Sequence, residues 1–60
     1  SPKEYLIEKR IALAKKLLTE STACISDISN SVGYEDQLYF SRIFKKKTGL
    51  SPLEFRKQAH

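Results

Sequence analysis

The sequence has few of the residues with which small proteins reinforce a fold. Only one of its 60 residues is cysteine, Cys24, so an intramolecular disulfide is impossible. The single histidine, His60, is the last residue, and one cysteine with one histidine cannot form a structural zinc site. A chain this short buries only about 60% of its unfolded surface. We therefore expect stability from helix packing alone, without metal or cofactor, or from contact with sequence outside this chain.

The sequence also has no apolar run long enough to cross a membrane and no signal peptide. Scarce cysteine is typical of a reducing compartment, so we expect a cytoplasmic protein with no membrane partner. The chain begins at Ser1 rather than at methionine, and we expect it to be part of a longer protein.

Catalytic groupings are missing as well. No Ser/His/Asp or Cys/His set is present, and so small a core cannot form a deep cleft. We therefore expect no enzyme activity and no catalytic residue.

Helix signals are abundant in what remains. Ser1-Pro2-Lys3-Glu4 has the pattern of a capping box, with proline at the first helical position, and Ser51-Pro52-Leu53-Glu54 repeats it. An aromatic residue follows in both places, fifty residues apart. The repeat indicates that another unit of the same kind precedes this one.

Periodicity and capping residues predict an all-α fold. Ser26, Asp36 and Ser51 are the expected N-caps, and Gly33 is the expected end of the second helix. The expected helices cover residues 2–19, 26–32, 37–47 and 52–55. This is a long linker helix (domain 1–20) followed by a helix-turn-helix subdomain with a short C-terminal helix (domain 21–60), a homeodomain-like half of a tandem unit.

The first helix carries one broad apolar side, formed by Leu6, Ile7, Ile11, Leu13, Ala14, Leu17 and Leu18. Arg10 lies within this side, so its charge either reaches water along its stem or pairs with an upstream unit. Leu6, Ile7 and Ile11 precede the part of the helix that faces the helix-turn-helix. In the isolated chain we expect these three to be exposed, frayed or buried against a second copy.

Basic residues are concentrated in the second half of the chain. Residues 31–60 hold six Lys/Arg against three Asp/Glu, whereas residues 1–30 hold five against four. An uneven basic excess is typical of a polyanion binder. A plain solvated surface is the other interpretation.

The helix expected at 37–47 presents an unusual outer face. With Phe40, Ile43 and Phe44 turned inward, the residues left outside are Leu38, Ser41, Arg42 and Lys45, flanked by Gln37 and Tyr39. These include groups that hydrogen-bond base edges and phosphates. A helix that docks on protein would instead show an apolar stripe. The sequence thus predicts a DNA-reading helix, with a helical protein-interaction module as the alternative.

Residues Ala14 to Arg56 resemble the second helix-turn-helix of AraC/XylS-type bacterial regulators. The matching positions are Ala14, Leu17, Leu18, Ile25, Ile28, Val32-Gly33-Tyr34, Tyr39-Phe40-Ser41-Arg42, Phe44-Lys45, Gly49, Ser51-Pro52 and Phe55-Arg56. Residues 1–10 resemble the helix that links the two motifs of the family. Ser29 departs from the usual alanine, and we expect it only to loosen the helix pair slightly.

The resemblance implies transcription regulation on double-stranded DNA, with two recognition helices in successive major grooves. It implies base contacts by Gln37, Leu38, Ser41 and Arg42, and backbone contacts by Tyr39, Lys45 and Lys46. It also implies an upstream helix-turn-helix in the same chain, an effector site only outside this chain, contact of activators with RNA polymerase, and a place on the bacterial nucleoid. We expect Arg56 to hold the last helix in place and Cys24 to be an ordinary small residue.

Overall fold

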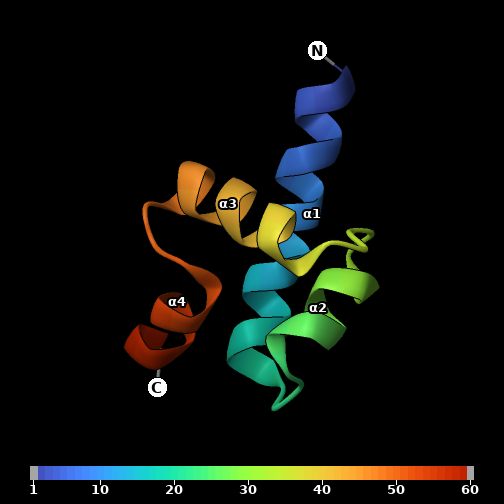
Figure 1. Ribbon diagram of the computed structural model, residues 1–60. Coiled ribbons are helices and arrows are strands. Elements are labelled where there is room, and N and C mark those ends of the chain that lie inside the picture. Colours follow the sequence, from blue (N-terminus) through green and yellow to red (C-terminus); the bar gives the residue numbers. More distant parts are fainter. Residues whose placement is uncertain (1, 60) are drawn as a thin grey trace.

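Four helices and no strand make up residues 2–59, the part of the chain that the computed structural model describes. The helices are α1 (Pro2–Glu20), α2 (Ile25–Ser31), α3 (Gln37–Thr48) and α4 (Pro52–Ala59). Figure 1 shows α2 and α4 on either side of the C-terminal half of α1, while the first turns of α1 extend beyond the other helices. The predicted all-α class with a helix-turn-helix is confirmed.

One hydrophobic core joins three of the helices and the turn between α2 and α3. Its buried members are Ile11, Ala14, Leu18, Ile28, Val32, Tyr34, Phe40 and Phe44. A row of rings runs through it, with centroid distances of 5.9 Å for Tyr34–Phe40, 5.8 Å for Phe40–Phe44 and 5.5 Å for Phe44–Phe55. Rings at these separations are in direct contact, so the row links the turn through α3 to α4.

The apolar side of α1 is divided between this core and solvent. Ile11 is only 4% exposed, so the expectation that it lies open in the isolated chain is wrong. It lies three residues before Ala14, or about 4.5 Å along the helix axis, and the core reaches that far. Ile7 packs partly against the core. Leu6 is 47% exposed and Leu13 is 45% exposed, so both remain outside.

The turn between α2 and α3 is closed by a set of short hydrogen bonds. Gly33 has a φ of +102°, its N–H donates to the Asn30 carbonyl, and the Tyr34 N–H donates to the Ser29 carbonyl. This is the Schellman arrangement that ends a helix at glycine. The buried Ser29 hydroxyl donates to the Tyr34 carbonyl over 2.7 Å. Ser29 therefore ties the turn to α2 through a bond that the usual alanine cannot make.

Arg10 is held within this chain. Its guanidinium lies 5.0 Å from the centre of the Tyr34 ring, a cation–π distance. A Cβ placed on Gly33 would lie only 3.0 Å from the guanidinium carbon. Arg10 thus covers the turn, and neither of its two expected roles describes this contact.

Local capping sets most helix boundaries. The Asp36 carboxylate accepts from the Leu38 N–H at the start of α3. Ser51 and Glu54 form the reciprocal bonds of a capping box at α4. The predicted cap at Ser26 is wrong, because α2 begins at Ile25 with Cys24 in the N-cap position and no side-chain bond there. The Ser1 cap lies outside the described residues.

The last helix is longer than predicted and is bound to the end of α1. It continues to Ala59 rather than ending at Phe55. The Arg56 guanidinium donates to the Leu18 carbonyl over 3.1 Å and to the Ser21 carbonyl over 3.3 Å. Carbonyls at a helix C-terminus have no partner within the helix, so Arg56 supplies one, and its predicted structural role is confirmed.

Candidate nucleic-acid interface

The outer face of α3 is set by the two rings on its inner face. Phe40 and Phe44 are fully buried. Leu38, Arg42 and Lys45 follow one another at spacings of four and three, so they share one helix face, and all three are exposed. Leu38 is 72% exposed, the highest value among the exposed large hydrophobic side chains. The predicted inward side is therefore confirmed for Phe40 and Phe44, and the predicted outward side for Leu38, Arg42 and Lys45. Ile43, predicted inward, and Ser41, predicted outward, are both half-buried.

The other predicted contact residues lie on the flanks of that face. Gln37 is exposed in the first turn, and Ser41 is half-buried. Tyr39 and Lys46 line a cleft of about 350 Å³ on the side towards α1. The Tyr39 ring also meets the Tyr34 ring edge-on at 5.8 Å. The structure thus brings Leu38, Arg42 and Lys45 together and places the remaining predicted residues beside them.

Charges on this face are largely unneutralised by the chain itself. Within residues 2–59, Arg42 and Lys46 have neither a hydrogen bond nor an ion pair. Lys45 interacts electrostatically with Glu54, which lies in the first turn of α4. Hydrogen bonding from the Ser51 backbone N–H, then from its side chain, lowers the pKa of Glu54, and Lys45 and Lys57 lower it further. Lys45 is therefore partly matched by an acid, whereas Arg42 is free for a ligand.

Two lysines outside the seven predicted contact residues join this basic surface. Lys3 and Lys47 line the same cleft as Lys46, together with the acid Glu4 and the apolar Ile7 and Ile43. Lys47 belongs to the run 45–47, whose place behind the outer face of α3 favours phosphate contact over a plain solvated run. Lys3 comes from the first turn of α1, and no local spacing signals its approach to α3.

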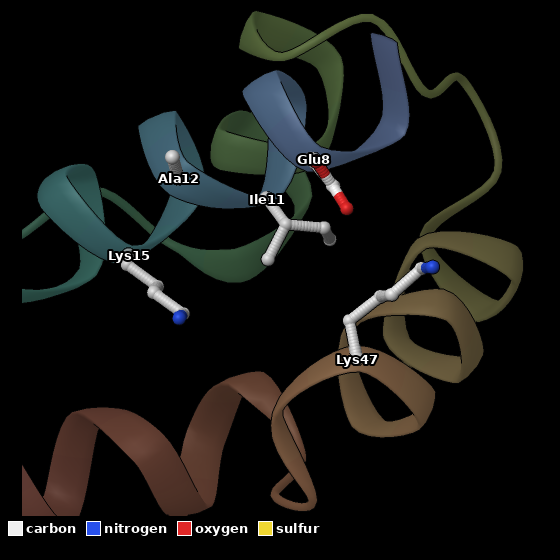
Figure 2. Close-up of a pocket in the computed structure, with 5 residues that line it drawn as sticks. All are labelled: Glu8, Ile11, Ala12, Lys15 and Lys47. Carbon is white, nitrogen blue, oxygen red and sulfur yellow. The ribbon is translucent and has the colours of Figure 1, made fainter. Parts of the chain in front are cut away.

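A second cleft lies further along the seam between α1 and α3. Figure 2 shows the residues that line it, Glu8, Ile11, Ala12, Lys15 and Lys47. The volume of this cleft is about 230 Å³. The Lys47 side chain rises from α3 towards α1 in this view. The one acid of this cleft, Glu8, lies among two lysines and two apolar residues. Across residues 2–59, no three His, Cys, Asp or Glu side chains gather as metal ligands.

No helix within residues 2–59 has the length and apolar character that a membrane span requires.

A short helix, a glycine turn and a second helix with an exposed basic face define a helix-turn-helix module. A family model described as "Helix-turn-helix domain" matches residues 1–58. The chain belongs to this AraC-type helix-turn-helix family, whose members are DNA-binding transcription regulators. The family match does not favour the protein-interaction alternative.

The relatives agree with this assignment. The chain is 53% identical over 49 residues to the arabinose operon regulatory protein of Salmonella typhimurium, covering 82% of this chain and 17% of that protein. It is 45% identical over 58 residues to the Msm operon regulatory protein of Streptococcus mutans, covering 97% and 21%. The chain therefore spans only about a fifth of the length of these curated relatives.

A solved structure matches the arrangement of the helices. It is the crystal structure of the C-terminal domain of the two-component response regulator yesN from Fusobacterium nucleatum. The TM-score is 0.89 at 37% identity, over 90% of this chain and 52% of that one.

Proposed function

We propose that this chain is the C-terminal DNA-reading half of an AraC-type DNA-binding domain, with α3 inserted in the major groove. The observation that supports the proposal is the asymmetry of α3. Its inner face is buried, its outer face offers Leu38, Arg42 and Lys45, and no acidic residue occurs from residue 37 to residue 53. The 12 residues of α3 span about 18 Å, and the major groove admits a helix.

We assign the proposed contact residues either to the base edges or to the DNA backbone, according to where they lie on α3. Gln37, Leu38, Ser41 and Arg42 contact base edges, because they lie on or beside the outer face near the start of the helix. Tyr39, Lys45 and Lys46 contact the DNA backbone. Tyr39 and Lys46 lie on the α1 side of α3, where a phosphate strand bordering the groove would pass.

The proposal includes an upstream helix-turn-helix in the same chain, with α1 (domain 1–20) joining it to the reading subdomain (21–60). Exposed apolar side chains on the first half of α1 support it, since Tyr5 is 60% exposed and Leu6 is 47% exposed. The greater length of the relatives supports it as well. Two recognition helices would then occupy major grooves roughly 34 Å apart on one face of the DNA.

The rest of the proposed setting follows from the family. We place the protein in the bacterial cytoplasm, on the nucleoid, at a promoter. Any effector binds to a domain outside these residues, and RNA polymerase is the proposed partner where the parent protein activates transcription. No enzyme activity is part of the proposal.

Replacing Arg42 tests the reading role of α3. In the full-length protein we expect Arg42→Ala to cost about 1–3 kcal/mol at a duplex selected from a random pool, because a bidentate contact to guanine is lost. Arg42→Lys should recover only part of that loss, since an ammonium cannot make the planar two-point contact. Fluorescence anisotropy with the selected and an unrelated duplex measures both values. An equal loss on both duplexes would assign Arg42 to the phosphates and contradict base reading.

The two proposed phosphate lysines are tested through salt dependence. Each phosphate contact removed lowers the slope of log affinity against log salt concentration by roughly one. We expect Lys45→Ala with Lys46→Ala to flatten the slope by up to about two, with the base preference unchanged. Lys9→Ala with Lys16→Ala is the matched control, because these exposed lysines point away from the α1 core face that holds Ile11 and Leu18. If the two double variants showed similar salt slopes, Lys45 and Lys46 would be ordinary solvated residues that do not contact phosphates.

A further inference from the structure

Among residues 2–59, Leu38 is the most exposed large hydrophobic side chain, and no packing contact within this part of the chain accounts for an apolar residue at this position. It lies in the first turn of α3 and is 72% exposed, although large apolar side chains gain by burial. Its backbone N–H is held by the Asp36 carboxylate over 2.9 Å, so the position of this turn is fixed. An apolar group thus stands at the leading end of the proposed reading helix, just after the Asp36 carboxylate that caps it.

DNA offers one apolar partner for such a group in the major groove. The 5-methyl group of thymine projects there, and cytosine, the other pyrimidine, has no methyl group and presents a donor instead. The Leu38 side chain has no hydrogen-bonding atom, so it cannot read guanine, adenine or cytosine through a polar contact. Contact with a methyl group would remove apolar surface from water on both partners.

The spacing between Leu38 and Arg42 limits how far apart the two base pairs that they contact can lie. The two residues are four apart on one face of α3, which corresponds to about 6 Å along the helix axis. Neighbouring base pairs are about 3.4 Å apart. A helix lying along the groove therefore places the two side chains over bases about two pairs apart.

We infer that Leu38 recognises the methyl group of a thymine that lies within about two base pairs of the guanine contacted by Arg42. This inference rests on the proposed function, which places α3 in the major groove. It adds the class of base that the apolar end of the helix selects and its distance from the guanine.

Removal of a single methyl group from the DNA tests the inference. A binding duplex is first selected from a random pool with the full-length regulator, and the Arg42 guanine is the position whose preference is lost in Arg42→Ala. Each nearby thymine is then replaced by deoxyuridine, and Kd is measured by anisotropy for the parent protein and for Leu38→Ala. We expect one replacement, within about two base pairs of that guanine, to weaken the parent about three- to fivefold.

The same replacement should change the affinity of Leu38→Ala by less than about 1.5-fold, because the partner of the methyl group is already gone. Leu53→Ala is the matched control, since Leu53 is also an exposed leucine, 53% exposed, but lies on α4. It should keep the full deoxyuridine penalty. Circular dichroism melting of Leu38→Ala checks that the helices are intact, as expected for an exposed position.

The possible failures are distinguishable. An equal deoxyuridine penalty in the parent and in Leu38→Ala would overturn the inference and leave major-groove reading by Arg42 in place. A second outcome would also overturn the inference: the parent shows no deoxyuridine penalty, and Leu38→Ala binds the thymine and deoxyuridine duplexes equally weakly. Leu38 would then contact sugar–phosphate or protein rather than a thymine methyl group. A selection that yields no preferred sequence would contradict the proposed function itself.

Discussion

Joined to an upstream unit, the chain is expected to bind a promoter duplex several orders of magnitude more tightly than the 60 residues alone. The short chain has only one proposed reading helix, so its Kd should lie near the nonspecific range, roughly 10⁻⁴ to 10⁻⁶ M. An upstream unit of about fifty residues, the spacing of the Ser-Pro-x-Glu repeat, makes the second contact intramolecular and raises its effective concentration.

Titration of one promoter duplex with the short and the extended protein measures this difference. Hydrogen exchange provides a second readout, because an upstream unit packed over Tyr5 and Leu6 should protect amides in the first half of α1. A scrambled duplex is the control and should show a much smaller gain. Equal nanomolar affinity for the short and extended proteins would contradict a two-unit reader.

Phe44→Ala is expected to remove most of the stability of the chain. Its fully buried ring contacts Phe40 on one side and Phe55 on the other. Truncating a buried phenylalanine costs about 3–5 kcal/mol, and a 60-residue domain has roughly 3–9 kcal/mol in total. We expect the cooperative urea transition, followed by circular dichroism, to shift to much lower urea or disappear, and DNA binding to be lost with it.

Leu53→Ala is the control for this loss of apolar volume, because Leu53 is 53% exposed. It should change the free energy of unfolding by less than about 0.5 kcal/mol. A Phe44→Ala protein that keeps the urea midpoint of the parent would show that the ring does not connect α3 with α4 in solution.

Short-range chemistry made much of the fold predictable. Asp36 bonds to an N–H two residues away, and Ser51 bonds to Glu54 three residues away. Gly33 ends its helix through bonds that reach back three to five residues. Such signals lie wholly within a few residues of sequence, so the start of α3, the start of α4 and the turn between α2 and α3 could all be predicted.

Boundaries set by tertiary contacts could not be predicted in this way. Ser26 is the better capping residue, yet α2 starts one residue before it, with Ile25 partly packed on the core. Residues after Phe55 show no apolar period, yet α4 continues to Ala59, and Arg56 bonds to α1 from within that extension. In both places the helix makes contacts with a distant part of the chain, which a local stretch of sequence does not contain.

The candidate interface divides in the same manner. The period of α3 alone shows that Phe40 and Phe44 face inward, and hence that Leu38 and Arg42 face outward. Two other features involve residues of different helices. Lys3 of α1 lines the same cleft as Lys46 of α3, and Lys45 of α3 lowers the pKa of Glu54 of α4. The arrangement of the helices, rather than any one motif, brings these charges together.

The contact between Arg10 and Gly33 has a consequence for how the turn can vary between related sequences. A side chain at residue 33 meets two separate obstacles: the Arg10 guanidinium 3.0 Å from its Cβ, which is the movable end of a flexible side chain, and a backbone φ of +102° that L-residues rarely adopt. A shorter residue in place of Arg10 would clear the first obstacle and leave the second untouched. A change at residue 10 therefore compensates only in part for a side chain at residue 33. Residue 10 can vary while residue 33 stays glycine, but no change at residue 10 removes the φ constraint that keeps residue 33 a glycine.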